Sequence, residues 1–82
     1  MAIEIAPGIV VDPTVRSGKP VVKGTRVAVE DVLELMAGGL TFDQVLTDAY
    51  PHLSRTDLES CLRYAAQVIK GEEIHVSLPP AP

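Results

Sequence analysis

Two short stretches of this sequence carry the signature of a helix N-terminus, and they lie close together in the chain. Thr41 is followed three residues later by Gln44, and Ser54 is followed three residues later by Asp57. In such a capping box, the first side chain accepts a hydrogen bond from the backbone of the later residue, whose side chain returns the contact. Two helices therefore begin within a short segment, which requires a tight connection between them and favours a small helical fold.

Apolar residues recur at helical spacing in three segments, at about 29–37, 41–49 and 55–70. The predicted buried faces are Val29, Val32, Leu33 and Met36 in the first, Phe42, Val45, Leu46 and Ala49 in the second, and Leu58, Cys61, Leu62, Ala65 and Ile69 in the third. Gly38 and Gly71 follow the first and third segments, where glycine typically ends a helix. The pattern predicts a mainly α fold with three helices.

The residues before the first helix favour strands. Ile3 to Ile5 and Ile9 to Val11 read as short extended pieces, and Pro20–Val22 and Arg26–Ala28 as the arms of a hairpin around a Lys23-Gly24 turn. We therefore divide the chain into an N-terminal β-element (1–28), a three-helix unit (29–71) and an extended tail (72–82).

The tail alternates apolar and polar residues as far as Leu78 and ends in a proline cluster. This alternation predicts a strand without a partner inside the three-helix unit. Such a strand needs the edge of a sheet, on this domain, on a second copy or on a partner protein. We expect Ile74, Val76 and Leu78 to contact the partner.

Length and charge limit the function classes. A chain of 82 residues forms one small domain that buries a modest fraction of its surface, so a homodimer or a partner protein would supplement its stability. The net charge of −4 excludes a wholly basic nucleic-acid binder, so any DNA contact must come from a local patch. We find neither a signal peptide nor an apolar run long enough for a membrane span, and we expect a cytoplasmic protein.

No pattern in the sequence indicates catalysis. There is no metal-ligand spacing, no glycine-rich phosphate loop and no Ser/His/Asp series, and His52 and His75 are the two histidines. Cys61, the single cysteine, lies on the apolar side of the third helix and is expected to be a small core residue. We expect no enzymatic activity, no metal and no cofactor.

The tight connection between the second and third helices describes a helix-turn-helix, in which the third helix enters the DNA major groove by its N-terminal half. The candidates on its outer side are Arg55, Thr56, Glu59, Ser60 and Arg63. The alternative is a scaffold helix, on which Glu59 and Arg63 form a surface ion pair at the favoured i, i+4 spacing.

Several blocks of the sequence together resemble the domain of unknown function 433 family. The blocks are Gly18–Val27, Val29–Leu35, Gly39–Thr41, Tyr50–Ser54 and Leu62–Ala66, within a match from about Ile9 to Gly71. The resemblance implies a homeodomain-like three-helix fold and a VapB-like antitoxin of a type II toxin-antitoxin pair. Such antitoxins dimerise, bind operator DNA and neutralise a PIN-like ribonuclease toxin. The sequence departs from the family pattern at Ala28, where a proline commonly opens the first helix.

Two hypotheses follow. In the first, the chain is a dimeric antitoxin whose Arg55, Thr56 and Arg63 face operator DNA while Lys23 and Arg26 contact phosphate, and whose tail contacts the toxin. In the second, it is a DNA-independent interaction and dimerisation module whose β-hairpin forms the dimer sheet. Arg26 is then a structural residue paired with Glu30 or Asp31.

Overall fold

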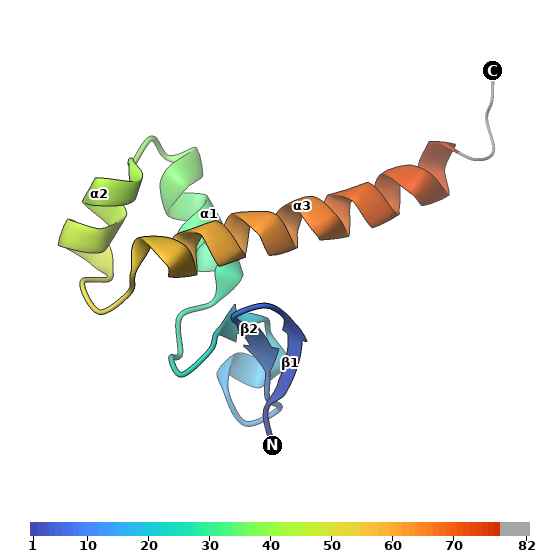
Figure 1. Cartoon of the computed structure of the whole chain (residues 1–82), viewed down its shortest axis with the longest axis horizontal. Coiled ribbons are helices and arrows are strands. Elements are labelled where there is room, and N and C mark those ends of the chain that lie inside the picture. Colours follow the sequence, from blue (N-terminus) through green and yellow to red (C-terminus); the bar gives the residue numbers. More distant parts are fainter. Residues whose placement is uncertain (78–82) are drawn as a thin grey trace.

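The protein is described by a computed structural model that covers the backbone of residues 1–77 and the side chains of residues 1–71. In chain order the elements are β1 (Ile3–Ala6), β2 (Ile9–Val11), η1 (Arg16–Gly18), β3 (Val21–Val22), α1 (Val29–Ala37), α2 (Phe42–Gln44), η2 (Val45–Ala49) and α3 (Arg55–Ser77). Over this range the fold is mixed α/β, with three α-helices and a small N-terminal antiparallel sheet (Figure 1). The expected combination of a β-element and three helices is confirmed.

The sheet has the strand order β1-β2-β3, and both pairings are antiparallel. The predicted turn at Lys23-Gly24 forms, because the Thr25 N–H donates to the Val22 carbonyl (3.0 Å) and Gly24 adopts a φ of +80°. The second predicted arm is not a full strand. Residues 26–28 return along β3 through a Val22 N–H to Val27 carbonyl bond (2.9 Å) and a single bridge between Val21 and Ala28.

Helix α1 begins without a side-chain cap, as the alanine at position 28 requires. The backbone N–H of Val29 instead donates to the carbonyl of Pro20 at 3.0 Å, and the Asp31 N–H donates to the Ala28 carbonyl at 3.1 Å. Helix starts leave such donors without a partner inside the helix. The residue that precedes β3 therefore ties the sheet to the start of α1.

Both predicted capping boxes are present. Thr41 Oγ1 accepts from the Gln44 N–H (3.2 Å) and Gln44 Oε1 from the Thr41 N–H (2.8 Å), while Ser54 and Asp57 exchange bonds of 3.1 and 2.9 Å. The helix after Thr41 is not α-helical throughout, because it widens into a π-helical turn, η2. There the Tyr50 N–H donates to the Val45 carbonyl, five residues back, at 2.8 Å.

Helix α3 is longer than predicted. It continues through Gly71 to Ser77, so the predicted stop at Gly71 and the predicted extended conformation of residues 72–77 are wrong. A glycine inside a helix costs about 1 kcal/mol, but it ends the helix only when the chain turns there. Leu78, the last of the predicted partner contacts, lies outside the described residues.

The core lies where the sheet, α1 and η2 meet the N-terminal half of α3. Its fully buried side chains include Ile9 of β2, Val32 of α1, Val45 of η2, and Leu58 and Cys61 of α3. Burial, aided by the nearby Asp57 carboxylate, raises the pKa of the Cys61 thiol to about 11, which is consistent with the predicted core role. None of the helices within residues 1–77 combines the length and apolarity that a membrane span needs.

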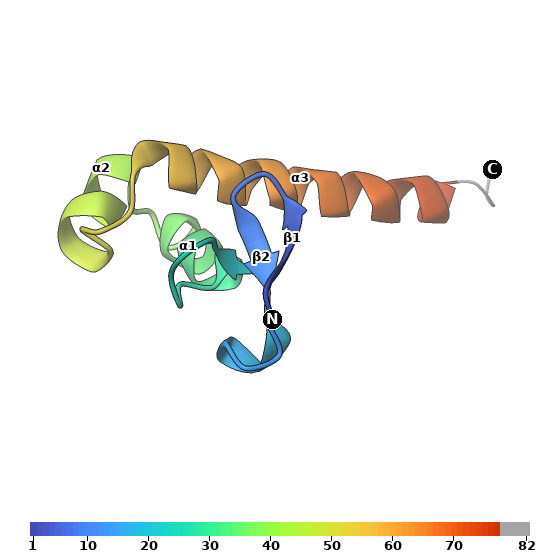
Figure 2. The same ribbon diagram turned by 60° about the horizontal axis from the view of Figure 1, so that its bottom comes forward.

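Two residues of the predicted buried face of α3 are exposed. Leu62 keeps 38% of its surface accessible and Ile69 keeps 53%. Helical spacing identifies one side of the helix, but it does not tell which part of that side another element covers. Leu62 lies at a surface hollow beside Glu59 and Arg63, and Ile69 lies at an open groove next to the start of α1. Figure 2 shows that α3 runs well past the sheet and α1. The assignment of Leu62 and Ile69 to the core was therefore wrong.

Candidate functional site

The outer side of α3 presents most of the residues that the sequence predicted for DNA contact, but Ser60 is half-buried beside Gly8 of the turn between β1 and β2 and does not lie on that side. Thr56, Glu59 and Arg63 are exposed. Among the side chains of residues 1–71, Arg63 has no ion-pair partner, so the alternative pairing of Glu59 with Arg63 does not form there. Arg63 is thus a cation whose charge no described acidic group neutralises.

Arg55 is placed differently from Arg63. Its guanidinium lies 4.8 Å from the centroid of the Phe42 ring and 3.7 Å from the Asp43 carboxylate. Cation–π contacts at exposed sites contribute about 0.5–1 kcal/mol, and exposed ion pairs contribute little. Arg55 therefore links α2 to the start of α3, although it stays accessible enough to contact a ligand.

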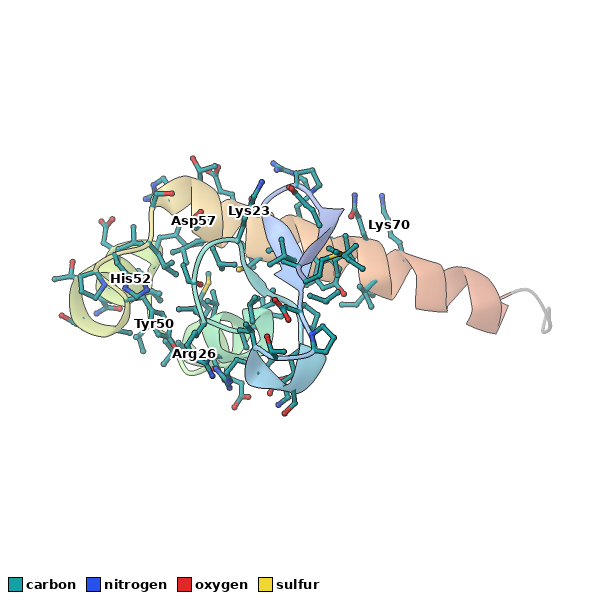
Figure 3. All side chains as sticks on the ribbon, turned by 90° about the horizontal axis from the view of Figure 1, so that it is seen from below. Lys23, Arg26, Tyr50, His52, Asp57 and Lys70 are labelled. Carbon is teal, nitrogen blue, oxygen red and sulfur yellow. The ribbon has the colours of Figure 1, made fainter. Side chains whose placement is uncertain are left out.

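The structure does not bring Lys23 and Arg26 together as one phosphate clamp. Lys23 Nζ lies 3.0 Å from Glu4 Oε1 in β1, and Figure 3 shows Lys23 and Arg26 on opposite sides of the molecule. The same view shows Lys70 of α3 extending toward the side that carries Lys23. The predicted site did not include Lys70, because its position in the helical pattern is that of any solvent-exposed lysine.

Glu4 joins the first strand to the turn that carries Lys23. Its carboxylate accepts from the Gly8 N–H at 2.9 Å and from Lys23 Nζ at 3.0 Å. Both contacts hold the pKa of Glu4 below its ordinary value, and the hydrogen bond from Gly8 has the larger effect. No sequence pattern predicted this link, because it joins residues far apart in the chain.

We expect Glu4→Gln to lower stability at neutral pH and to have a smaller effect in acid. A carboxylate with a depressed pKa stabilises the folded state above its unfolded-state pKa, and this contribution is lost as the pH falls through the lowered folded-state pKa. Thermal melts from neutral pH down to pH ~3 should therefore converge for the two proteins. A constant difference at every pH would show that the charge of Glu4 does not contribute.

Two basic side chains near η1 hold the acidic start of α1. Arg16 Nη1 lies 3.0 Å from Asp31 Oδ2 and 3.1 Å from the Arg26 carbonyl oxygen. Lys19 Nζ lies 3.0 Å from Glu30 Oε2. The predicted pairing of Arg26 with Glu30 or Asp31 is therefore wrong, since both carboxylates are taken by residues from the segment before β3.

The backbone explains how Arg16 reaches α1. Arg16 and Ser17 have φ angles of +50° and +59°, and Gly18 follows at +81°. Such a left-handed turn is costly for residues other than glycine, and the contacts of Arg16 help to offset it. The oxygens of Glu30, Asp31 and Glu34 lie within 4.8 Å of one another, but two of these three groups already accept bonds from Lys19 and Arg16.

A shallow apolar groove runs between α1 and α3. It has a volume of about 300 Å³ and is lined by Pro20, Val29, Glu30, Leu33, Tyr64, Ala65, Val68 and Ile69. The sequence did not predict it, because it assigned Leu33 and Ile69 to a closed core. The predicted partner contacts Ile74 and Val76 fall on the α3 segment beyond this groove.

These features define a small mixed α/β protein with three helices, an N-terminal sheet and an exposed outer face on its longest helix. The family model described as protein of unknown function (DUF433) matches residues 9–65, more than half of the chain, and the chain belongs to that family. The predicted family is therefore confirmed.

One solved structure shares the fold. It is the crystal structure of a DUF433 member protein from Anabaena variabilis ATCC 29413 at 2.00 Å resolution, with a TM-score of 0.71 and 23% sequence identity. The similarity covers 85% of this chain and 68% of that one. At this level of identity the match extends to the fold alone. No curated protein matches this sequence.

Proposed function

We propose that this protein is the antitoxin of a type II toxin-antitoxin pair, which binds its own operator DNA as a dimer and neutralises a PIN-like ribonuclease. Helices α1, α2 with η2, and α3 then act as a homeodomain-like helix-turn-helix, with α3 as the recognition helix. The chain's net charge of −4 suits a complex with a basic nuclease.

The observation that carries the DNA part is the outer face of α3. Thr56 and Arg63 are exposed there, Thr56 in the first turn of α3 and Arg63 two turns further on, and Arg63 has no acidic partner among residues 1–71. Recognition helices contact base edges through their N-terminal residues, and arginine is the commonest side chain to do so. Lys23 and Lys70, which extend to one side of the molecule, are suited to phosphate contacts next to this face.

A second candidate is a DNA-independent interaction module. It is favoured by the pairing of Arg16, Lys19, Lys23 and Arg55 with acidic side chains of the same chain. These pairs reduce the positive charge available for phosphate. The two candidates differ in one measurable property, the dependence of DNA binding on salt.

We expect Arg63→Ala to weaken binding to the DNA upstream of its own gene by roughly 5-fold to 150-fold, since the loss of one good base contact costs about 1–3 kcal/mol. Mobility-shift titrations at several salt concentrations measure the effect. If Arg63 contacts phosphate, the salt slope also falls by about one unit.

Lys19→Ala is the matched control, because it removes one positive charge from a side chain that faces Glu30 instead of the outer face of α3. Its titration should stay close to that of the wild type. Equal losses in both variants would indicate a non-specific charge effect. A wild-type protein without salt-dependent DNA binding would favour the interaction module.

A further inference from the structure

The outer side of α3 carries a hollow that is lined by three side chains of different chemistry. The hollow has a volume of about 380 Å³, and its walls are Glu59, Leu62 and Arg63. Glu59 and Arg63 are exposed, and Leu62 keeps 38% of its surface accessible. Figure 2 shows α1 and the sheet on one side of α3, which leaves the opposite side uncovered by any element of residues 1–77. A ligand therefore meets an anion, an apolar group and a cation at one place.

Glu59 is the unexpected member of this set, because a carboxylate on a surface that faces DNA repels the phosphates. The i, i+4 spacing would allow Arg63 to neutralise it. However, no ion pair among the side chains of residues 1–71 includes either group. The carboxylate is therefore available as a hydrogen-bond acceptor. In the major groove, the donor that acidic side chains contact is the N4 amino group of cytosine.

The order of the three side chains around α3 matches the major-groove edge of a G·C pair. At about 100° per residue, Arg63 projects about 40° to one side of Glu59, and Leu62 about 60° to the other. The edge of the base pair presents the guanine N7 and O6 acceptors, then the cytosine N4 donor, and then the apolar C5–H of cytosine. The donor, the acceptor and the apolar group of α3 thus each meet their complement.

The positions along the helix are compatible with a single base pair. Glu59 and Arg63 lie about 6 Å apart along the axis, at 1.5 Å per residue. Helical side chains lean toward the N-terminus, so the long arginine side chain reaches back over the turn that carries Glu59. An A·T pair fits the same hollow poorly, because the thymine O4 acceptor replaces the cytosine amino group and meets the carboxylate.

We propose that Glu59 and Arg63 are the specificity-determining residues of α3, and that together they select one G·C pair, with Leu62 packed against the cytosine C5–H. The inference rests on the proposed function, since it requires α3 to enter the major groove. It deepens that function, because it names the base pair and makes an acidic residue a determinant of sequence. Glu59 lowers the affinity for DNA in general and rejects the wrong sequences, as specific interfaces commonly do.

The test is a selection from duplex DNA with a randomised segment of about 20 base pairs, two turns of the double helix. The wild-type chain, Glu59→Ala and Arg63→Ala each select duplexes by mobility shift, and the bound DNA is sequenced. The wild type should enrich a G·C pair at a fixed position. Titrations of the enriched duplex and of its A·T counterpart then measure the preference for that pair. Each variant should lose a factor of roughly 5 to 150 in this preference, at the same base pair.

Glu34→Ala is the matched control, because it removes the same charge from an exposed residue of α1. Its selected sequence should equal that of the wild type. All three substitutions place alanine at exposed helical positions, so the variants should fold, which circular dichroism verifies.

The outcomes separate this inference from the proposed function. If Glu59 is an ordinary solvated carboxylate, Glu59→Ala will tighten binding to all duplexes alike and leave the selected sequence unchanged. That result would overturn the inference alone, as would a wild type that binds DNA without a sequence preference, or two variants that relax different base pairs. A wild-type chain that binds none of the duplexes would overturn the inference together with the DNA part of the proposed function.

Discussion

Leu58→Ala should lower the midpoint of thermal unfolding by about 10–40 °C. Leu58 is fully buried in α3 and lies in the cluster that joins the sheet, α1 and η2. Removing a leucine side chain from such a site costs about 2–5 kcal/mol, because apolar contacts are lost and a cavity remains. In a domain of this size, each kcal/mol shifts the midpoint by roughly 4–8 °C.

Leu62→Ala is the control for this result, because it makes the same chemical change one turn along the helix at a residue that is 38% exposed. Its midpoint should fall by only a few degrees, since less apolar area is lost and no closed cavity forms. Both melts need the same low protein concentration, because association raises apparent stability. Equal shifts for Leu58→Ala and Leu62→Ala would contradict the position of the core.

Local signals in the sequence predicted the parts of the fold that depend on neighbours in the chain. The capping boxes at Thr41 and Ser54 formed as predicted, because their partners lie three residues away and the hydrogen bonds need no other element. The turn at Gly24 is of the same kind. Its residues fix their own backbone angles, so the sequence is sufficient to predict them.

Features that depend on distant segments could not be predicted in this way. The helical spacing of Ile69 marks a face of α3, but whether another element covers that face depends on where α1 begins. The contacts of Lys23 with Glu4 and of Arg16 with Asp31 join separate segments that are brought together only by the fold. Gly71 shows a limit of local signals too, because a glycine ends a helix only when the following chain turns away.

The turn between β1 and β2 offers the second test with a large expected effect, because it fixes the sheet on α3. Gly8 has a φ of +79°, and a Cβ added there would lie 3.0 Å from Ser60 Oγ. Gly8→Ala therefore combines backbone strain of about 1–2 kcal/mol with overpacking of about 1 kcal/mol or more. We expect it to destabilise the protein by roughly 2–3 kcal/mol in chemical denaturation.

Gly24→Ala separates the two contributions, since Gly24 has nearly the same φ, +80°, and open space around the added methyl group. It should cost only the backbone strain, about 1–2 kcal/mol. Adding Ser60→Ala to Gly8→Ala removes the crowded hydroxyl and should recover most of the difference between the two glycine variants, as a double-mutant cycle measures. If Ser60→Ala recovers nothing, or if the two glycine variants lose equal stability, the sheet does not pack on α3 at Ser60 as closely as the structure shows.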